Sequence, residues 1–127
     1  MKIQEKSDKR FVLNHVGVEW ITYYDSASNS FAVFHEDETP SGDEYVKAPY
    51  AESAKTEMWK RFYEMLDEEE LTVVNDFPGG RGFYRYLEEE GLRGILECAQ
   101  EEAETVLFDQ WEKDHSLAID WETATIA

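Results

Sequence analysis

Apolar and polar residues alternate most clearly in the first third of the chain. Residues 16–24 (VGVEWITYY) and 30–35 (SFAVFH) are rich in β-branched and aromatic side chains, and the polar segment DSASN lies between them. Such side chains favour strands, and a short polar break between two such runs is typical of a turn. The pattern therefore predicts a β-hairpin.

The two faces of the first predicted strand differ in character. Trp20, Thr22 and Tyr24 alternate with Ile21 and Tyr23, and successive side chains of a strand point to opposite sides. One face is therefore expected to pack inward while the other carries tyrosines. One hypothesis is that the hairpin exposes Trp20 and Tyr23 for dimerisation, which leaves the oligomeric state open between monomer and homodimer.

Three further segments carry weaker strand patterns. Residues 11–15 (FVLNH) fit a strand or a short helix, and residues 117–127 (LAIDWETATIA) fit a final strand or a tail that drapes over the surface. Residues 36–50 combine clustered acids with two prolines and a glycine, which predicts an exposed acidic loop. Inside that loop, Tyr45 and Val46 suit a short strand.

The next part of the chain shows helical spacing. The segment AESAKTEMWKRFYEMLDEEE begins at Ala51, and its residues Met58, Phe62 and Met65 lie on one stripe. A stripe with this spacing is expected to face a core. A second helix is predicted through FYRYLEEE, ending at Gly91.

A third helix is predicted from Leu92 to about Ser116. Cys98 lies on it beside an apolar position, so it is expected to be a small core or boundary residue rather than a nucleophile. The apolar residues of this helix recur with a period close to 3.6. They are Ile95, Ala99, Ala103, Val106 and Trp111.

The order of these elements predicts the fold class. Strands first and helices afterwards favour an α+β fold, here an N-terminal antiparallel β-hairpin or small sheet packed against three C-terminal helices. The length of 127 residues is usual for one domain that buries a core without metal or disulfide support. No linker or internal repeat divides the chain, so residues 1–127 are predicted to form a single domain.

The chain carries a large negative charge. It has 29 Asp and Glu residues against 12 Lys and Arg residues, a formal charge of -17. Binding to a phosphate backbone needs cationic side chains that displace counterions, so direct nucleic-acid binding is not expected. The segment 1–10 is the exception, because its four basic residues outnumber its two acids and make it mildly basic.

Acids become denser toward the carboxyl end. From Tyr86 onward, twelve acids stand against two basic residues. Glu97, Glu101 and Glu104 fall on one stripe of the last predicted helix, where like charges repel by roughly a few tenths of a kcal/mol per pair. Such a stripe is either a solvated surface or the face that a basic partner protein covers.

No metal, cofactor or catalytic residue is predicted. His15, His35 and His115 are far apart in the sequence, and a helical metal pair needs two imidazoles one turn apart. The run HEDE, which starts at His35, is therefore interpreted as a solvated strand end. The runs of acids are interpreted as solvated helix ends, because a general acid needs a carboxyl group in a dry pocket.

The sequence favours a cytoplasmic location. A single cysteine cannot form an internal disulfide, which indicates a reducing compartment. The first ten residues, MKIQEKSDKR, lack the apolar core of a signal peptide, and no apolar run approaches the roughly 20 residues needed to cross a bilayer. No membrane association is expected.

The most distinctive segment of the chain is residues 78–86, PGGRGFYRY. The backbone amides of a glycine-rich turn before a helix are able to hold an anion, with arginines as charge partners. The alternative is a structural turn in which Arg81 pairs with nearby acids, because the Lys-Ser/Thr pair of a phosphate-binding loop is missing. The residues of the candidate ligand site are Gly80, Arg81, Gly82, Tyr84 and Arg85.

Four segments resemble an uncharacterised family of small acidic bacterial proteins, family 0158. They are the hairpin GVEWITYYDSASNSFAVFHEDE, the helix MWKRFYEMLDEEE, the turn and helix GRGFYRYLEEEGL, and the last helix with DQWEKDHSL. The Gly-Arg-Gly-aromatic signature of that family corresponds to Gly80, Arg81, Gly82 and Phe83. The resemblance implies the family's architecture and a bacterial cytosolic origin, and it implies no mechanism.

Two functional hypotheses follow. The first is a non-enzymatic module that binds a macromolecule: an immunity-like or antitoxin-like protein, or a mimic of nucleic acid, whose carboxylates engage a basic protein. The second is a small anionic-ligand binder or an enzyme that uses the Gly-Arg-Gly turn. The lopsided charge and the lack of a catalytic constellation favour the first.

Overall fold

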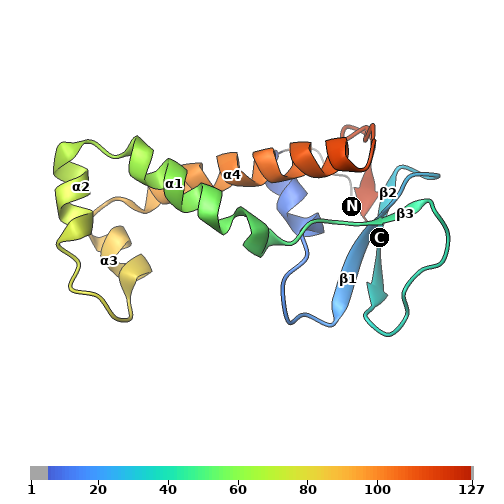
Figure 1. Cartoon of the computed structure of the whole chain (residues 1–127), viewed down its shortest axis with the longest axis horizontal. Coiled ribbons are helices and arrows are strands. Elements are labelled where there is room, and N and C mark those ends of the chain that lie inside the picture. Colours follow the sequence, from blue (N-terminus) through green and yellow to red (C-terminus); the bar gives the residue numbers. More distant parts are fainter. Residues whose placement is uncertain (1–5, 127) are drawn as a thin grey trace. The chain divides into compact units, whose positions relative to one another are not determined.

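The computed structural model describes residues 6–126 of the chain, which form an α+β fold (Figure 1). Over these residues a mixed sheet of four strands is accompanied by four α-helices and two 3-10 helices. The predicted fold class is confirmed. Within the same residues, no helix combines the length and the apolar composition that crossing a membrane requires.

The predicted hairpin forms the centre of the sheet. Its strands β1 (Trp20–Asp25) and β2 (Ser30–His35) are antiparallel. Strand β3 (Tyr45–Lys47) pairs antiparallel with β1, and strand β4 (Thr125–Ile126) pairs parallel with β2. The strand order is therefore β3-β1-β2-β4, and the optional strands expected in the acidic loop and in the tail are both present.

The helices follow the hairpin, as expected, but the first predicted helix is divided in two. The 3-10 helix η2 (Ala51–Ala54) leads into α1 (Lys55–Met65), and α2 (Glu68–Asn75) begins after a break. Asp67 causes the break because it caps α2: its side chain accepts a hydrogen bond from the backbone N–H of Glu70 at 2.8 Å, and the Glu70 carboxylate accepts one from the Asp67 N–H at 3.0 Å. Such a capping box marks the start of a helix.

The remaining helices lie close to their predicted bounds. Helix α3 (Phe83–Glu89) ends just before Gly91, whose φ of +75° only glycine adopts easily. Helix α4 (Arg93–Asp114) is the long last helix. At the other end of the chain, residues 11–15 form no strand: the 3-10 helix η1 (Lys6–Val12) ends there, and Asn14 makes a single bridge with Tyr50.

The chain divides into two compact units. The first comprises Met1–Ser53 and Thr105–Ala127, and the second comprises Ala54–Glu104. The sheet, η1 and the tail belong to the first unit, whereas α1, α2 and α3 belong to the second. Helix α4 begins in the second unit and ends in the first.

The core of the first unit is aromatic. The Trp111 side chain is 5 % exposed, and its ring N–H donates a hydrogen bond to the Lys47 carbonyl at 2.9 Å. Trp121 of the tail stacks on Phe31 of β2, with ring centroids 5.4 Å apart. The other buried members of this core are Val12, Leu13, Tyr24, Phe108 and Ala124.

Hydrogen bonds at the hairpin turn fix the tail. Asn29, in the left-handed conformation with φ of +50°, accepts a hydrogen bond from the Tyr24 hydroxyl at 2.7 Å. Its side-chain amide donates to the Asp120 carbonyl at 3.0 Å and to the Thr123 hydroxyl at 3.1 Å. Asp120 and Thr123 are thereby tied to the turn between β1 and β2.

Asn14 ties three segments together in the interior of the first unit. Its side chain is 2 % exposed. Its amide donates to the carbonyls of Thr22 at 3.1 Å and Ala48 at 2.9 Å, and its carbonyl accepts from the Thr22 N–H at 2.7 Å. Because buried polar groups are costly unless paired, this set of bonds fixes the start of β1 against the segment that follows β3.

The second unit has its own core, and the predicted apolar stripes are wrong at one position there, Met65, and at one position in the first unit, Val106. Met65, expected inside, is 40 % exposed because α1 ends at this residue, and Val106 on α4 is 43 % exposed because the buried line continues through Leu107 and Phe108. The buried apolar residues of the second unit are Ala54, Met58, Phe62, Val74, Leu87, Leu92, Leu96, Ala99 and Ala103.

Candidate functional site

The glycine-rich turn of the second unit has the backbone geometry of a tight turn. Gly80 has a φ of +84°, and Gly82, the N-cap of α3, has a φ of +89°. A Cβ added at either residue would meet no atom within 4 Å. The backbone conformation, and not close approach of another group, is therefore what requires glycine at these positions.

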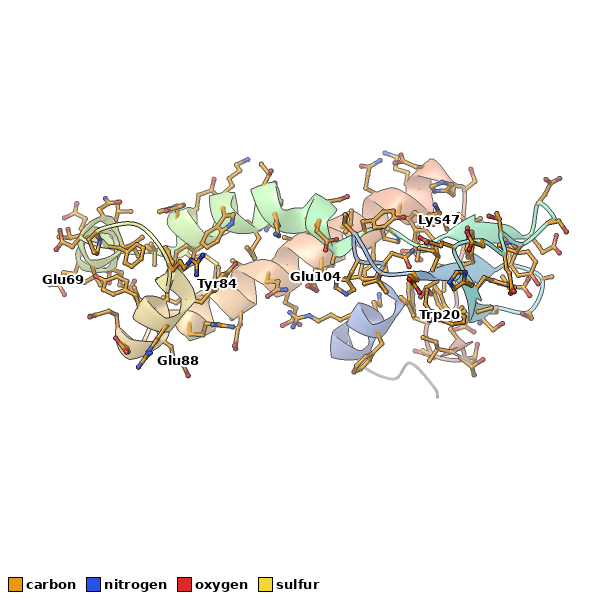
Figure 2. All side chains as sticks on the ribbon, turned by 90° about the horizontal axis from the view of Figure 1, so that it is seen from below. Trp20, Lys47, Glu69, Tyr84, Glu88 and Glu104 are labelled. Carbon is orange, nitrogen blue, oxygen red and sulfur yellow. The ribbon has the colours of Figure 1, made fainter. Side chains whose placement is uncertain are left out.

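Two of the other predicted residues, Tyr84 and Arg85, make contacts within the second unit. The Arg85 guanidinium lies 3.2 Å from the Glu89 carboxylate, one turn along α3. Tyr84, labelled in Figure 2, is 49 % exposed, and its ring centroid lies 5.2 Å from the guanidinium carbon of Arg93. Arg81 is exposed. Gly80, Arg81, Gly82, Tyr84 and Arg85 thus lie in one turn and the helix that follows it.

The predicted acidic stripe of the last helix is interrupted. Glu97 is exposed and lies 3.8 Å from Arg93, and Glu101 is exposed as well. Glu104 is only 6 % exposed, so the expectation that it belongs to an outer face is wrong. It lies one helical turn before the buried Phe108 on α4 and therefore shares its face.

The other candidate groups of the sequence are spread out. Among residues 6–126, no group of three or more His, Cys, Asp or Glu side chains is arranged so that it could hold a metal ion. Cys98 is exposed, although its spacing on α4 suggested a core or boundary position. The basic segment 1–10 lies partly outside the described residues. Within it, the Lys9 ammonium lies 4.3 Å from the centroid of the Trp121 ring.

Large apolar side chains are exposed where β1 begins and β2 ends. We define the open end of the hairpin as residues 15–20 and 33–38, which lie opposite the hairpin turn. Trp20 is 58 % exposed, and its ring meets His35 edge to face with centroids 5.2 Å apart. The other exposed apolar residues of this end are Val16, Val18 and Val33.

The exposure of Trp20 follows from its position on the strand. Trp20, Thr22 and Tyr24 share one face of β1, and Tyr24 lies under Phe31 and Trp111 at the turn end. Trp20, labelled in Figure 2, lies four residue pairs further along the hairpin and is 58 % exposed. Tyr23, expected to be exposed, is buried on the opposite face, where it packs edge to face on Phe34 with centroids 5.8 Å apart.

The same end is uniformly acidic. From Phe11 to Val46 the chain contains seven acids and not one Lys or Arg. His35 lies between two of these acids: its Nε2 is 3.5 Å from the Glu19 carboxylate, and its Nδ1 is 3.6 Å from that of Asp37. The carboxylates of the open end are those of Glu19, Glu36, Asp37 and Glu38.

An open cavity of about 390 Å³ lies beside these acids. Residues 15–19 line it, together with Ile21, Glu36 and Tyr50. Glu19 and Glu36 are direct neighbours across the hairpin, because the Glu36 N–H donates to the Glu19 carbonyl at 2.8 Å. The cavity therefore combines two opposed acids with apolar, imidazole and phenol groups.

Glu52 of η2 supports the imidazole that lines this cavity. The His15 Nδ1 lies 3.6 Å from a Glu52 carboxylate oxygen. The backbone N–H of Glu52 itself, with a smaller contribution from that of Val16, holds the pKa of the Glu52 carboxyl below its usual value of 4.5, against the opposing effect of burial. A carboxylate thus stays ionised beside His15 at neutral pH.

The sequence pattern presented His15 and His35 as isolated side chains and did not predict this cavity. Residues 15–19 and Tyr50 meet only because β3 brings the following segment back beside β1, a long-range pairing without a local pattern. The uninterrupted lack of Lys and Arg between Phe11 and Val46 was the available signal.

Searches against protein-family models, curated proteins and solved structures found no match to this chain. The resemblance to family 0158 thus stays a prediction.

Proposed function

We propose that this chain is a non-enzymatic, macromolecule-binding module whose open hairpin end docks a basic protein. The observation that carries the proposal is an exposed tryptophan among exposed valines, bordered by carboxylates, in a stretch without any Lys or Arg. A partner that offers apolar and cationic side chains would match both properties.

The energetics of protein interfaces support this choice of surface. A few residues supply most of the binding energy of an interface, and tryptophan is among the commonest of them. Trp20 offers a large apolar area that is 58 % exposed. The surrounding acids speed encounter with a basic partner and disfavour acidic ones, since like charges repel across an interface.

The class of partner follows from this chemistry. A protein that binds phosphate backbones carries a basic surface, and an acidic module with an apolar anchor is suited to cover it, as an antitoxin-like or immunity-like protein would. A bacterial cytoplasmic setting belongs to the same proposal. It is supported by the single cysteine and by the resemblance to family 0158.

The proposal is tested by capture from bacterial lysate on immobilised protein. We expect a basic protein to be retained at low salt and released at high salt, because salt screens charge pairs. The Trp20→Ala variant should retain at least about tenfold less of it, the loss expected when an anchor residue is removed.

Tyr63→Ala is the matched control. Tyr63 is an exposed aromatic residue, 44 % exposed, that belongs to the second unit. This variant should retain the partner like the unmodified chain. If no basic protein is retained, or if Trp20→Ala and Tyr63→Ala retain it equally, the proposal is wrong.

A further inference from the structure

Two acids that are neighbours across the hairpin line the cavity beside its open end. Glu19 and Glu36 are opposed across the hairpin, joined by the 2.8 Å hydrogen bond between their backbones. Like charges directly opposite each other on paired strands are destabilising. A cation between them would remove this repulsion.

The walls of the cavity suit one kind of cation. The Tyr50 ring offers a face for cation–π contact, and Val16 and Val18, 71 % and 47 % exposed, offer an apolar rim. A long aliphatic stem with a charged head fits such walls, because the stem packs on apolar surface while the head reaches polar groups. The volume of about 390 Å³ lies in the usual range of ligand sites, roughly 300–1,000 Å³.

The planar guanidinium group matches this set of groups best. It presents five N–H donors in a fixed fork, pairs with carboxylates and stacks on aromatic rings. The Lys47 ammonium lies 5.9 Å from the Tyr50 ring centroid, near the limit for cation–π contact, and Lys47 does not line the cavity. None of the lining residues is itself a Lys or Arg.

We infer that the cavity receives an arginine side chain, supplied by the basic partner. That the arginine comes from a basic partner rests on the proposed function. That the cavity binds an arginine side chain rests on its lining residues alone. Glu36 and Glu19 accept the guanidinium N–H groups, Tyr50 stacks on the guanidinium plane, and the two valines contact the methylene stem.

The test is an NMR titration of the ¹⁵N-labelled chain with N-acetyl-arginine amide. N-acetyl-citrulline amide, which has nearly the same shape but carries no charge, is the matched probe. We expect the arginine compound to shift the amide signals of Gly17, Val18 and Glu36, and the citrulline compound to leave them unchanged. Both Glu36→Gln and Glu19→Gln should weaken binding by about tenfold, the loss of one charge-assisted hydrogen bond.

Glu122→Gln is the control variant, since it removes one exposed acid of the first unit that does not line the cavity. It should bind the arginine compound like the unmodified chain. No shift at these amides, equal shifts with citrulline, or full binding by both Glu36→Gln and Glu19→Gln would overturn the inference. If arginine amide binds but no basic protein is captured, the cavity is confirmed while the proposed function fails.

Discussion

The two ends of the same hairpin have opposite environments. At the turn end, Tyr24 and Phe31 are buried under Trp111 and Trp121. At the open end, Trp20 continues the same face of β1 but is 58 % exposed. One strand therefore serves stability at its end and presents an apolar side chain to solvent at its beginning.

This difference concerns the face of β1 that carries Trp20 and Tyr24, since Ile21 and Tyr23 on the opposite face are both buried. The buried cluster uses the last residues of β1 and the first residues of β2, where α4 and the tail pack. On this face Trp20 lies beyond that cover and stays 58 % exposed, and a large apolar surface left exposed often marks an interaction site. The stability losses caused by Trp111→Ala and Trp20→Ala are therefore compared to test this difference.

The largest effect is expected from Trp111→Ala. This change removes a side chain that is 5 % exposed, together with its hydrogen bond to the Lys47 carbonyl. We expect the free energy of unfolding to fall by about 3–5 kcal/mol, as measured by urea denaturation. Trp20→Ala should lower it by less than about 1 kcal/mol, and similar losses in the two variants would contradict the comparison.

The next largest effect is expected from Asn14→Ala. Asn14 bonds to Thr22, which lies on β1 between the open end and the turn end of the hairpin. The change leaves the buried Thr22 N–H without its acceptor and the Ala48 carbonyl without its donor. We expect a loss of about 2–3 kcal/mol in the free energy of unfolding, because unpaired buried groups keep their full desolvation cost. A loss within about 0.5 kcal/mol would show that Asn14 does not hold β1 in place.

A smaller effect is expected from the acid titration of Glu52. Its folded pKa lies below the usual 4.5, so the unfolded chain binds its proton more readily. Its contribution to stability is thus present above pH 4.5 and is lost as the pH falls through the folded pKa. Urea denaturation along a descending pH series should show a smaller loss for Glu52→Gln than for the unmodified chain, and parallel curves would exclude this role.

The smallest effect is expected from Arg81→Ala in the glycine-rich turn. Arg81 is an exposed residue, and surface substitutions of this kind usually change the free energy of unfolding by less than about 0.5 kcal/mol. We expect capture of the basic partner to remain unchanged too, because recognition is assigned to the open hairpin end. Reduced capture would show that the binding surface includes the glycine-rich turn and would contradict this assignment.

The sequence was sufficient to predict the elements that have a local pattern. The alternation around Trp20 and Phe31 predicted the hairpin, and Gly91 predicted the end of α3. The capping box at Asp67 was missed because a continuous apolar stripe through Met65 suggested one long helix. The burial of Glu104 was missed because helical spacing alone does not reveal which residues the surrounding chain covers.

The candidate site was less predictable than the fold. Its parts are Val16, Glu19, Glu36 and Tyr50, which are separated along the chain and brought together by pairing of β1 with β2 and β3. The exposure of Trp20 depends on where α4 and the tail stop covering the sheet, which is a property of packing and not of periodicity. The charge of this region, in contrast, was readable directly from its composition.

The most direct test is to locate where a basic protein surface binds. A ¹⁵N NMR titration with a peptide that contains arginine and leucine maps the contact residue by residue. The account predicts signal shifts in residues 15–20 and 33–38, with binding weakened in Trp20→Ala. Shifts confined to α4 around Glu97 and Glu101, with Trp20→Ala binding normally, would contradict it.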